Sequence, residues 1–184
     1  VVNRADVGAE PLAAFCRDWL GSDLVAGPHP DGSGAWTARL ARAEHGEQAL
    51  TPAQLRARLV PAPVPAPVRD RALAMLDRLA DAEARAHGVP AAQVHFHELG
   101  HLDTLFDLVG VPLLLHAAGI ERVHCTPLEL GRGTVMTGHG ELAVPAPATR
   151  ELLRASAAVV TAGRHDGERT TPTGAVLAVT LCDF

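Results

Sequence analysis

The most informative absence in this 184-residue sequence is lysine, because all 16 of its basic residues are arginines. Without a lysine amine, the chain cannot form a Schiff base with a carbonyl substrate and cannot build a Walker-type phosphate loop. Any catalytic base must therefore be a carboxylate or an imidazole, and any partner for a phosphate must be an arginine or the backbone.

Aromatic residues are also scarce at 3%, tyrosine is absent, and the formal net charge is −5. An acidic chain without a basic run does not fit a protein that binds the phosphate backbone of nucleic acids. So few rings also leave no platform on which single-stranded bases could stack. We expect a small-molecule substrate and no nucleic-acid partner, while the oligomeric state stays open, a homo-oligomer included.

Cysteine is limited to Cys16, Cys125 and Cys182, an odd number with wide spacing and no C-x-x-C pair. This pattern fits neither a disulfide framework nor a zinc ribbon. The opening VVNRADVGAE lacks the charged and apolar regions of a signal peptide, and the longest apolar run, LVGVPLLLHAAGI, is too short and interrupted to span a bilayer. We expect a cytoplasmic protein with no membrane partner.

Apolar residues at helical spacing predict several helices. The best pattern is terminated by His87-Gly88, and its inward positions are Val68, Ala72, Met75, Leu76, Leu79 and Ala82. Weaker patterns predict helices at 9–20, from Thr51-Pro52 onward, at 103–119 and at 149–155, and strands at 35–46, 91–99 and 121–130.

Helices and strands alternate, which predicts an α/β or α+β fold with a mixed sheet flanked by helices in a single domain. Residues 1–60 are expected to form an N-terminal helix and strand portion of that domain. Residues 61–68 (PAPVPAPV) are expected to be a stiff, extended connector, and residues 69–184 to form the core.

Ten histidines stand against four Phe and two Trp, and they concentrate in HFHELGHLDTLFD (95–107). Neutral imidazoles and carboxylates are ligands for divalent first-row metals. The stretch supplies the candidate ligands His95, His97, His101 and Asp107, and the candidate catalytic residues His97, Glu98 and Asp103. The alternative is a set of satisfied polar side chains at a strand-to-helix junction, with Asp103 serving as an N-cap.

Residues 97–101 also read H-E-x-x-H. On a helix, His97 and His101 would lie one turn apart and bind zinc while Glu98 polarises a water molecule. Asp107 stands where extended versions of the motif have a third ligand, but Thr104 replaces their glycine. A zinc peptidase is therefore kept as an alternative.

Four ordered blocks resemble a known family. They are LADAEARAHG (79–88), VHFHELGHLDTLFDLVG (94–110), LGRGTVMTGHGELAVPAPATRELL (130–153) and ERTTPTGAVL (168–177). Together they closely resemble the nickel-insertion proteins that complete the nickel-pincer nucleotide cofactor of lactate racemase, and the chain is similar to their N-terminal domain.

The resemblance implies a lyase-type chelatase that inserts Ni(II) between two thiocarboxylates and a ring carbon of a pyridinium mononucleotide, with CTP hydrolysis. Imidazole and carboxylate would hold nickel loosely enough to pass it to softer sulfur ligands. Metallation of a ring carbon also requires removal of a proton, for which Glu98 or a histidine is the candidate base. The family's polar positions fall on His95, His97, Glu98, Asp103, Asp107 and His139, which adds His139 to the candidate metal ligands.

The nucleotide-like substrate would bring a phosphate. Arg132, together with Thr171, Thr173 and Gly174 of TPTG, are the candidate groups to bind it, since hydroxyls and turn amides favour an anion. Ordinary turn chemistry is an equal explanation for both glycine-containing segments.

The sequence departs from the family pattern at three places. Ala9 stands where the family has an aspartate, His101 stands where it has a small residue, and no CTP-binding C-terminal part follows before Phe184. These departures leave two further hypotheses open. One is a recruited homologue that acts as a metal-independent acid/base enzyme on a small organic substrate, and the other is a nickel-carrying partner protein.

Overall fold

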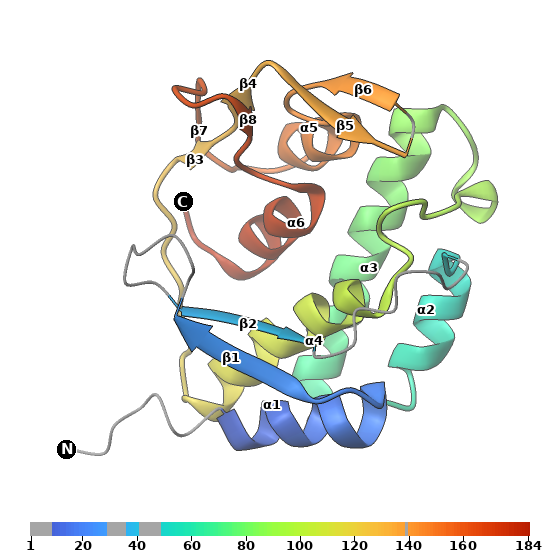
Figure 1. The fold of residues 1–184 in the computed structure, drawn as a ribbon, viewed down its shortest axis with the longest axis vertical. Coiled ribbons are helices and arrows are strands. Elements are labelled where there is room, and N and C mark those ends of the chain that lie inside the picture. The colour runs from blue at the N-terminus through green and yellow to red at the C-terminus, as the bar shows by residue number, and fades with distance from the viewer. Residues whose placement is uncertain (1–8, 29–35, 41–48, 139) are drawn as a thin grey trace.

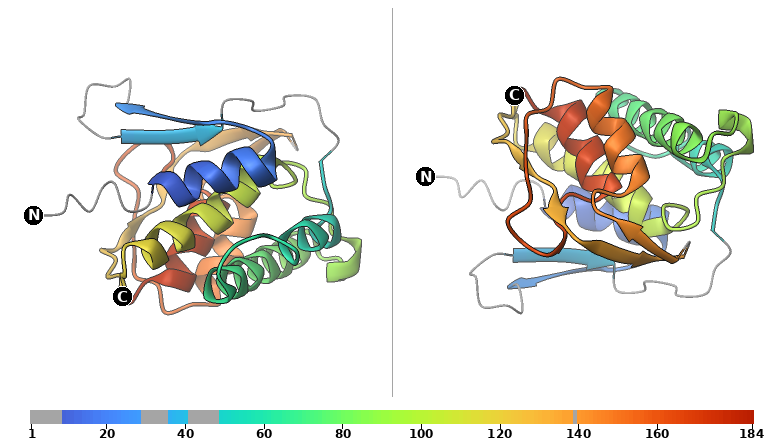
Figure 2. Two further views of the ribbon diagram at one scale, coloured as in Figure 1. Left: turned by 90° about the horizontal axis from the view of Figure 1, so that it is seen from below. Right: turned by 90° about the horizontal axis from the view of Figure 1, so that it is seen from above.

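The computed structural model describes residues 9–28, 36–40, 49–138 and 140–184, and its longest helix, α3, runs along one side of the molecule (Figures 1 and 2). The helices are α1 (Ala9–Phe15, continued by a π-helical turn at Cys16–Leu20), α2 (Pro52–Leu59), α3 (Ala66–His87), a 3₁₀ turn (Ala91–Gln93), α4 (Leu102–Ala117), α5 (Pro147–Arg154) and α6 (Pro172–Leu181). Helix α3 packs against α2, α4, α5 and α6, whereas α1 packs against α4.

The strands of the described residues form four separate pairs. They are the antiparallel hairpins β1 (Leu24–Pro28) with β2 (Trp36–Leu40) and β5 (Thr134–Thr137) with β6 (Gly140–Ala143), the antiparallel pair β4 (Gly131–Arg132) with β8 (Gly167–Glu168), and the parallel pair β3 (Leu128–Glu129) with β7 (Val160–Thr161). The β1–β2 hairpin lies beside α1, and the β5–β6 hairpin lies at the opposite end, near the C-terminal end of α3 (Figures 1 and 2). The mixed α/β class is confirmed, but these pairs do not join into one sheet, and β3, β4, β7 and β8 have only two residues each.

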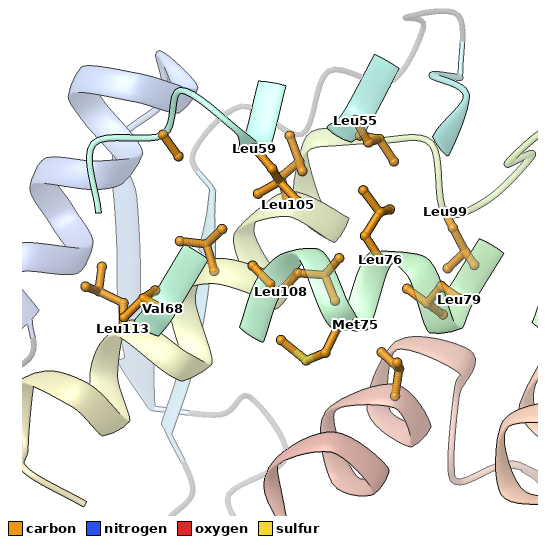
Figure 3. Close-up of a cluster of buried hydrophobic side chains, with 14 of the residues drawn as sticks. Leu55, Leu59, Val68, Met75, Leu76, Leu79, Leu99, Leu105, Leu108 and Leu113 are labelled. Atoms are coloured by element: carbon orange, nitrogen blue, oxygen red, sulfur yellow. The ribbon is translucent and has the colours of Figure 1, made fainter. Parts of the chain in front are cut away.

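The hydrophobic core lies between α2, α3, α4 and α6, where the buried side chains point toward one another (Figure 3). All six inward positions predicted for α3 are buried. Because a fully buried leucine or methionine contributes about 2–5 kcal/mol relative to alanine, this helix accounts for a large part of the stability of the fold.

The helix boundaries follow the predicted capping chemistry at two places. The Thr51 hydroxyl accepts a hydrogen bond from the Gln54 N–H (3.3 Å), and the Gln54 side chain accepts one from the Thr51 N–H (2.8 Å). This reciprocal capping box starts α2 with Pro52 at its first position. At the C-terminal end of α3, Gly88 adopts the left-handed conformation (φ +67°) that ends the helix after His87.

The predicted strand at 91–99 is wrong. Residues 91–93 form the 3₁₀ turn, and residues 94–100 continue as irregular chain. The alternation in the sequence is real, since Val94 and Phe96 are 3% and 2% exposed while His95 and His97 face solvent. However, no described strand lies alongside to pair with this segment, so the alternating burial does not produce a sheet.

Other boundaries also shift. Helix α3 begins at Ala66, inside the proline-rich segment, because Pro67 is tolerated in the first turn of a helix. The strand predicted at 121–130 is reduced to β3 and an isolated bridge at His124. Most of the strand predicted at 35–46 lies outside the described residues, and only Trp36–Leu40 is seen as β2. Within the described residues, no helix combines the length and apolar character needed to cross a bilayer.

Candidate functional site

A cavity of about 270 Å³ lies where the C-terminal end of α3, the 94–100 segment, the β5–β6 hairpin and the N-terminal ends of α5 and α6 meet. We call it the candidate pocket. Its lining residues are Glu83, Ala86, His87, His97, Glu98, Thr137, Leu142, Ala146, Pro147, Ala148 and Pro172. Imidazole and carboxylate side chains from different parts of the chain thus face one space.

The end of α3 contributes Glu83 and His87, which lie one helical turn apart and therefore share a face of the helix. The His87 Nε2 atom lies 3.3 Å from Glu83 Oε2. Because Gly88 ends the helix immediately afterwards, the chain turns away and leaves the His87 ring at the cavity.

The 94–100 segment contributes His97 and Glu98. The segment is held by Phe96 and Leu99, which are 2% and 7% exposed, so the residues between them are turned outward. Gly100 fixes its far end, since its carbonyl accepts a hydrogen bond from the Leu50 N–H (2.8 Å). A Cβ at Gly100 would lie 2.6 Å from the Leu50 nitrogen, so only glycine fits there. The His97 and His87 rings are 6.5 Å apart between centroids.

Glu98 connects this segment to the β5–β6 hairpin. Its Oε1 atom accepts a hydrogen bond from the Gly138 N–H at 2.7 Å. The hairpin contributes Thr137 and Leu142 to the cavity wall, so Glu98 both faces the cavity and holds the opposite wall in position.

Glu168 is a second carboxylate near Glu98. Burial raises the pKa of Glu168, and the negative charge of Glu98 raises it further, while hydrogen bonds from Ala146 and Thr149 act in the opposite direction. The Ala146 N–H donates to Glu168 Oε1 at 3.3 Å, which positions this carboxylate at the start of α5. Two neighbouring carboxylates, one of which retains a proton more readily than usual, are suited to proton transfer.

The remaining candidates of the 95–107 cluster do not line the candidate pocket. His95 is exposed, and His101 occupies the N-cap position of α4. Asp103, predicted as a possible N-cap, instead lies in the first turn of α4, where its Oδ1 accepts a hydrogen bond from the Thr104 N–H (2.9 Å). Asp107 lies one turn further on, and burial, with the charge of Asp103, raises its pKa to about 6.

The geometry required by the zinc-peptidase hypothesis is absent. His97 and Glu98 precede α4, which begins at Leu102, so His97 and His101 are not on consecutive turns of one helix. His97 lines the cavity, whereas His101 does not. The H-E-x-x-H pattern is therefore not a zinc-binding helix in this fold.

His139, the remaining candidate metal ligand, lies outside the described residues. Within the part of the chain that the structure describes, no three His, Cys, Asp or Glu side chains come close enough together to hold a metal ion.

The candidate phosphate-binding residues occupy two places. Arg132 is exposed and pairs with Asp166 (2.7 Å). Thr171 is the N-cap of α6, and its hydroxyl accepts a hydrogen bond from the Gly174 N–H (3.2 Å), so the TPTG segment starts a helix. Thr173 and Gly174 lie in the first turn of α6, next to Pro172 at the cavity wall.

Three polar residues of this region were missed by the sequence reasoning. Glu83 and His87 were assigned only to a helix and its end, although their spacing of four residues next to a terminating glycine places them together on one face. Glu168 opens the ERTTPTGAVL block but carries no local signal, because only the tertiary fold brings it near Glu98.

Comparison with known proteins identifies the family of this chain. The family model described as "Nickel insertion protein" matches residues 11–184. The chain belongs to the nickel insertion protein family.

Three curated relatives, all named for nickel insertion, illustrate the similarity. The protein from Thermomicrobium roseum is 46% identical over 132 residues, which cover 72% of this chain and 32% of the relative. The protein from Pelobacter propionicus is 50% identical over 115 residues (62% and 29%), and that from Roseiflexus castenholzii is 38% identical over 164 residues (89% and 42%). The chain thus spans about a third of the length of the curated relatives it matches. No solved structure matches it.

Proposed function

We propose that this chain takes part in inserting Ni(II) into a small sulfur-bearing heterocycle, a pyridinium mononucleotide with two thiocarboxylates, and that the candidate pocket receives the reacting ring. The observation that carries this proposal is the meeting of His87, His97, Glu98 and Glu168 in and beside one cavity. Membership of the nickel insertion protein family supports the choice of metal. The lyase-type reaction and its coupling to CTP belong to the same proposal.

In this proposal, nickel is a substrate that the protein holds only in passing. Imidazole and carboxylate groups bind Ni(II) more weakly than thiolate-like sulfur does, so transfer to the thiocarboxylates is favourable. The described part of the cavity offers no complete set of three protein ligands. The substrate's sulfur atoms therefore complete the coordination, and His139 is proposed as a further ligand.

The carboxylates would carry the proton chemistry. Formation of a nickel–carbon bond releases a proton from the ring, and Glu98 is the proposed base, with Glu168 as the group that accepts the proton from it. A cavity of about 270 Å³ accommodates a heterocyclic ring better than a whole mononucleotide. We therefore place the phosphate at the first turn of α6, near Thr173 and Gly174.

Nickel calorimetry on untagged protein that has been treated with a chelator tests the proposal. His97→Ala is expected to weaken nickel binding at least tenfold in the presence of the thiocarboxylate substrate. His95→Ala is the matched control, since His95 is exposed two residues away and does not line the cavity. Absence of stoichiometric nickel binding by the unmutated chain, with or without substrate, would reject the proposal. Nickel binding without insertion would instead identify a carrier.

The Glu98–Glu168 pair favours a second candidate function, metal-independent proton transfer on a small organic substrate. The raised pKa of Glu168 beside a second carboxylate is an arrangement typical of acid/base sites. Turnover that survives chelation and is lost in Glu98→Gln would support this function over nickel insertion.

A further inference from the structure

Two of the three cysteines meet at the end of α6, although they are far apart in the sequence. The Asp183 N–H donates to the Val123 carbonyl (2.8 Å), and the Cys125 N–H donates to the Asp183 carbonyl (3.0 Å). This parallel bridge pairs Asp183 with His124. Because side chains alternate along extended chain, Cys125 and Cys182 lie on the same face of the bridge.

The side chains of Cys125 and Cys182 lie close enough to influence each other: burial raises the pKa of Cys182, and the neighbouring Cys125 raises it further. The Cys125 thiol donates a hydrogen bond to the Thr126 carbonyl at 3.1 Å. Both cysteines are partly exposed, whereas Cys16 is completely buried and burial raises its pKa to about 11. An ion pair between Arg122 and Asp183 (3.1 Å) ties the same two segments together. A small reagent can therefore reach this pair but not Cys16.

We propose that Cys125 and Cys182 form a reactive dithiol that closes to an intramolecular disulfide on reaction with a low-molecular-weight disulfide such as oxidised glutathione. The Cys125 thiolate attacks one sulfur of the reagent, which forms a mixed disulfide and releases one glutathione thiol. The Cys182 thiolate then attacks the Cys125 sulfur, and the second glutathione leaves. The two protein thiols are oxidised, one reagent disulfide is reduced, and the two thiol protons end on the two glutathione molecules.

The cross-link would act on α6 from its C-terminal end. Cys182 follows directly after this helix, and Pro172 at the other end of the helix lines the candidate pocket. A disulfide to Cys125 therefore fixes the helix that forms one edge of the pocket onto the segment at 123–125.

Mass spectrometry of the native chain after chelator treatment and incubation with oxidised glutathione tests the proposal. We expect the loss of two hydrogen atoms from the intact mass and a peptide cross-link between Cys125 and Cys182. Closure is expected to accelerate between about pH 7 and pH 9, since the thiolate is the attacking species. The disulfide is also expected to raise Tm, because it closes a long loop.

Three single variants complete the test. Cys16→Ser is expected to close the cross-link as the unmutated chain does. Cys125→Ser and Cys182→Ser are each expected to retain one glutathionyl group instead. Uptake of two glutathionyl groups without a cross-link, a cross-link to Cys16, or no reaction of the unmutated chain would each overturn the proposal, whether or not the variants fold.

Discussion

At the scale of single residues, His87 tests most directly whether the candidate pocket binds nickel. Its ring lines the cavity together with that of His97, and the two ring centroids are 6.5 Å apart. We expect His87→Ala to weaken nickel binding at least tenfold by calorimetry, because the variant removes an imidazole ligand while α3 still ends at Gly88. His116→Ala, on an exposed face of α4, is the control. Unchanged nickel binding in His87→Ala would show that His87 is not a nickel ligand and that the metal is bound by residues 97–98 without it.

Asp107 makes a prediction about pH and stability. Its pKa is about 6 in the folded chain against an ordinary 3.8, since burial and the charge of Asp103 oppose its ionisation. Below about pH 4 the Asp107 carboxyl group is protonated in both the folded and the unfolded chain. At these pH values the folded chain carries no charge at this position, and its stability is not reduced by one. The free energy of unfolding then falls as pH rises through about 6, because the folded chain must carry a half-buried charge that the unfolded chain exposes to water.

Asp107→Asn removes this cost. We expect the variant to have a free energy of unfolding about 1–3 kcal/mol higher than the unmutated chain at pH 7–8, with the difference disappearing below about pH 4. Urea unfolding across this pH range measures the effect. Asp81→Asn, which replaces an exposed carboxyl group on α3, is the control for the Asp-to-Asn exchange itself. A constant difference at all pH values would contradict the titration of Asp107 as its cause.

At the scale of elements, the irregular 94–100 segment depends on Gly100. A Cβ at this position would lie 2.6 Å from both the Leu50 nitrogen and the Phe96 carbonyl oxygen, which are backbone atoms that cannot move aside cheaply. We expect Gly100→Ala to lower the free energy of unfolding by more than about 2 kcal/mol and to disturb His97 and Glu98. Gly174→Ala, in the first turn of α6, meets only the Thr171 hydroxyl at 3.4 Å and should change stability by less than about 1 kcal/mol. Equal stabilities of the two variants would contradict this account.

Features that depend on neighbouring residues in the sequence could be predicted, whereas features that depend on tertiary contacts could not. Local chemistry was sufficient for the start of α2 at Thr51-Pro52, for the end of α3 at Gly88 and for its buried face, since each depends on neighbours in the sequence. The period-two pattern around Phe96 agrees with the alternating burial of this segment but wrongly predicted a strand, because a strand requires a partner that the sequence does not reveal. His97 and Glu98 were predicted as site residues because histidines and carboxylates are concentrated in the 95–107 stretch. Glu168 was not found, because its role as a neighbour of Glu98 exists only after folding.

At the scale of the whole molecule, one hydrophobic cluster includes residues from Leu12 in α1 to Val176 in α6. A single shared core of this kind predicts one cooperative unfolding transition. Tryptophan fluorescence and far-UV circular dichroism should therefore give coincident urea transitions, and Leu79→Ala should shift both together by about 2–5 kcal/mol. Arg71→Ala, an exposed position on α3, is the control. Separate transitions by the two probes would show that the α1 end and the α6 end unfold independently.

Helix α3 has a consequence for how this protein could change over generations or in laboratory selection. It is 22 residues long, about 33 Å, and the same rod carries Met75 and Leu79 in the core and Glu83 and His87 at the cavity. A substitution that repacks the core tilts the rod and moves Glu83 and His87 as a unit relative to His97, without changing a cavity residue. A library selected for altered metal or substrate preference is therefore expected to be enriched in conservative exchanges at Met75 and Leu79 as well as in changes within the pocket.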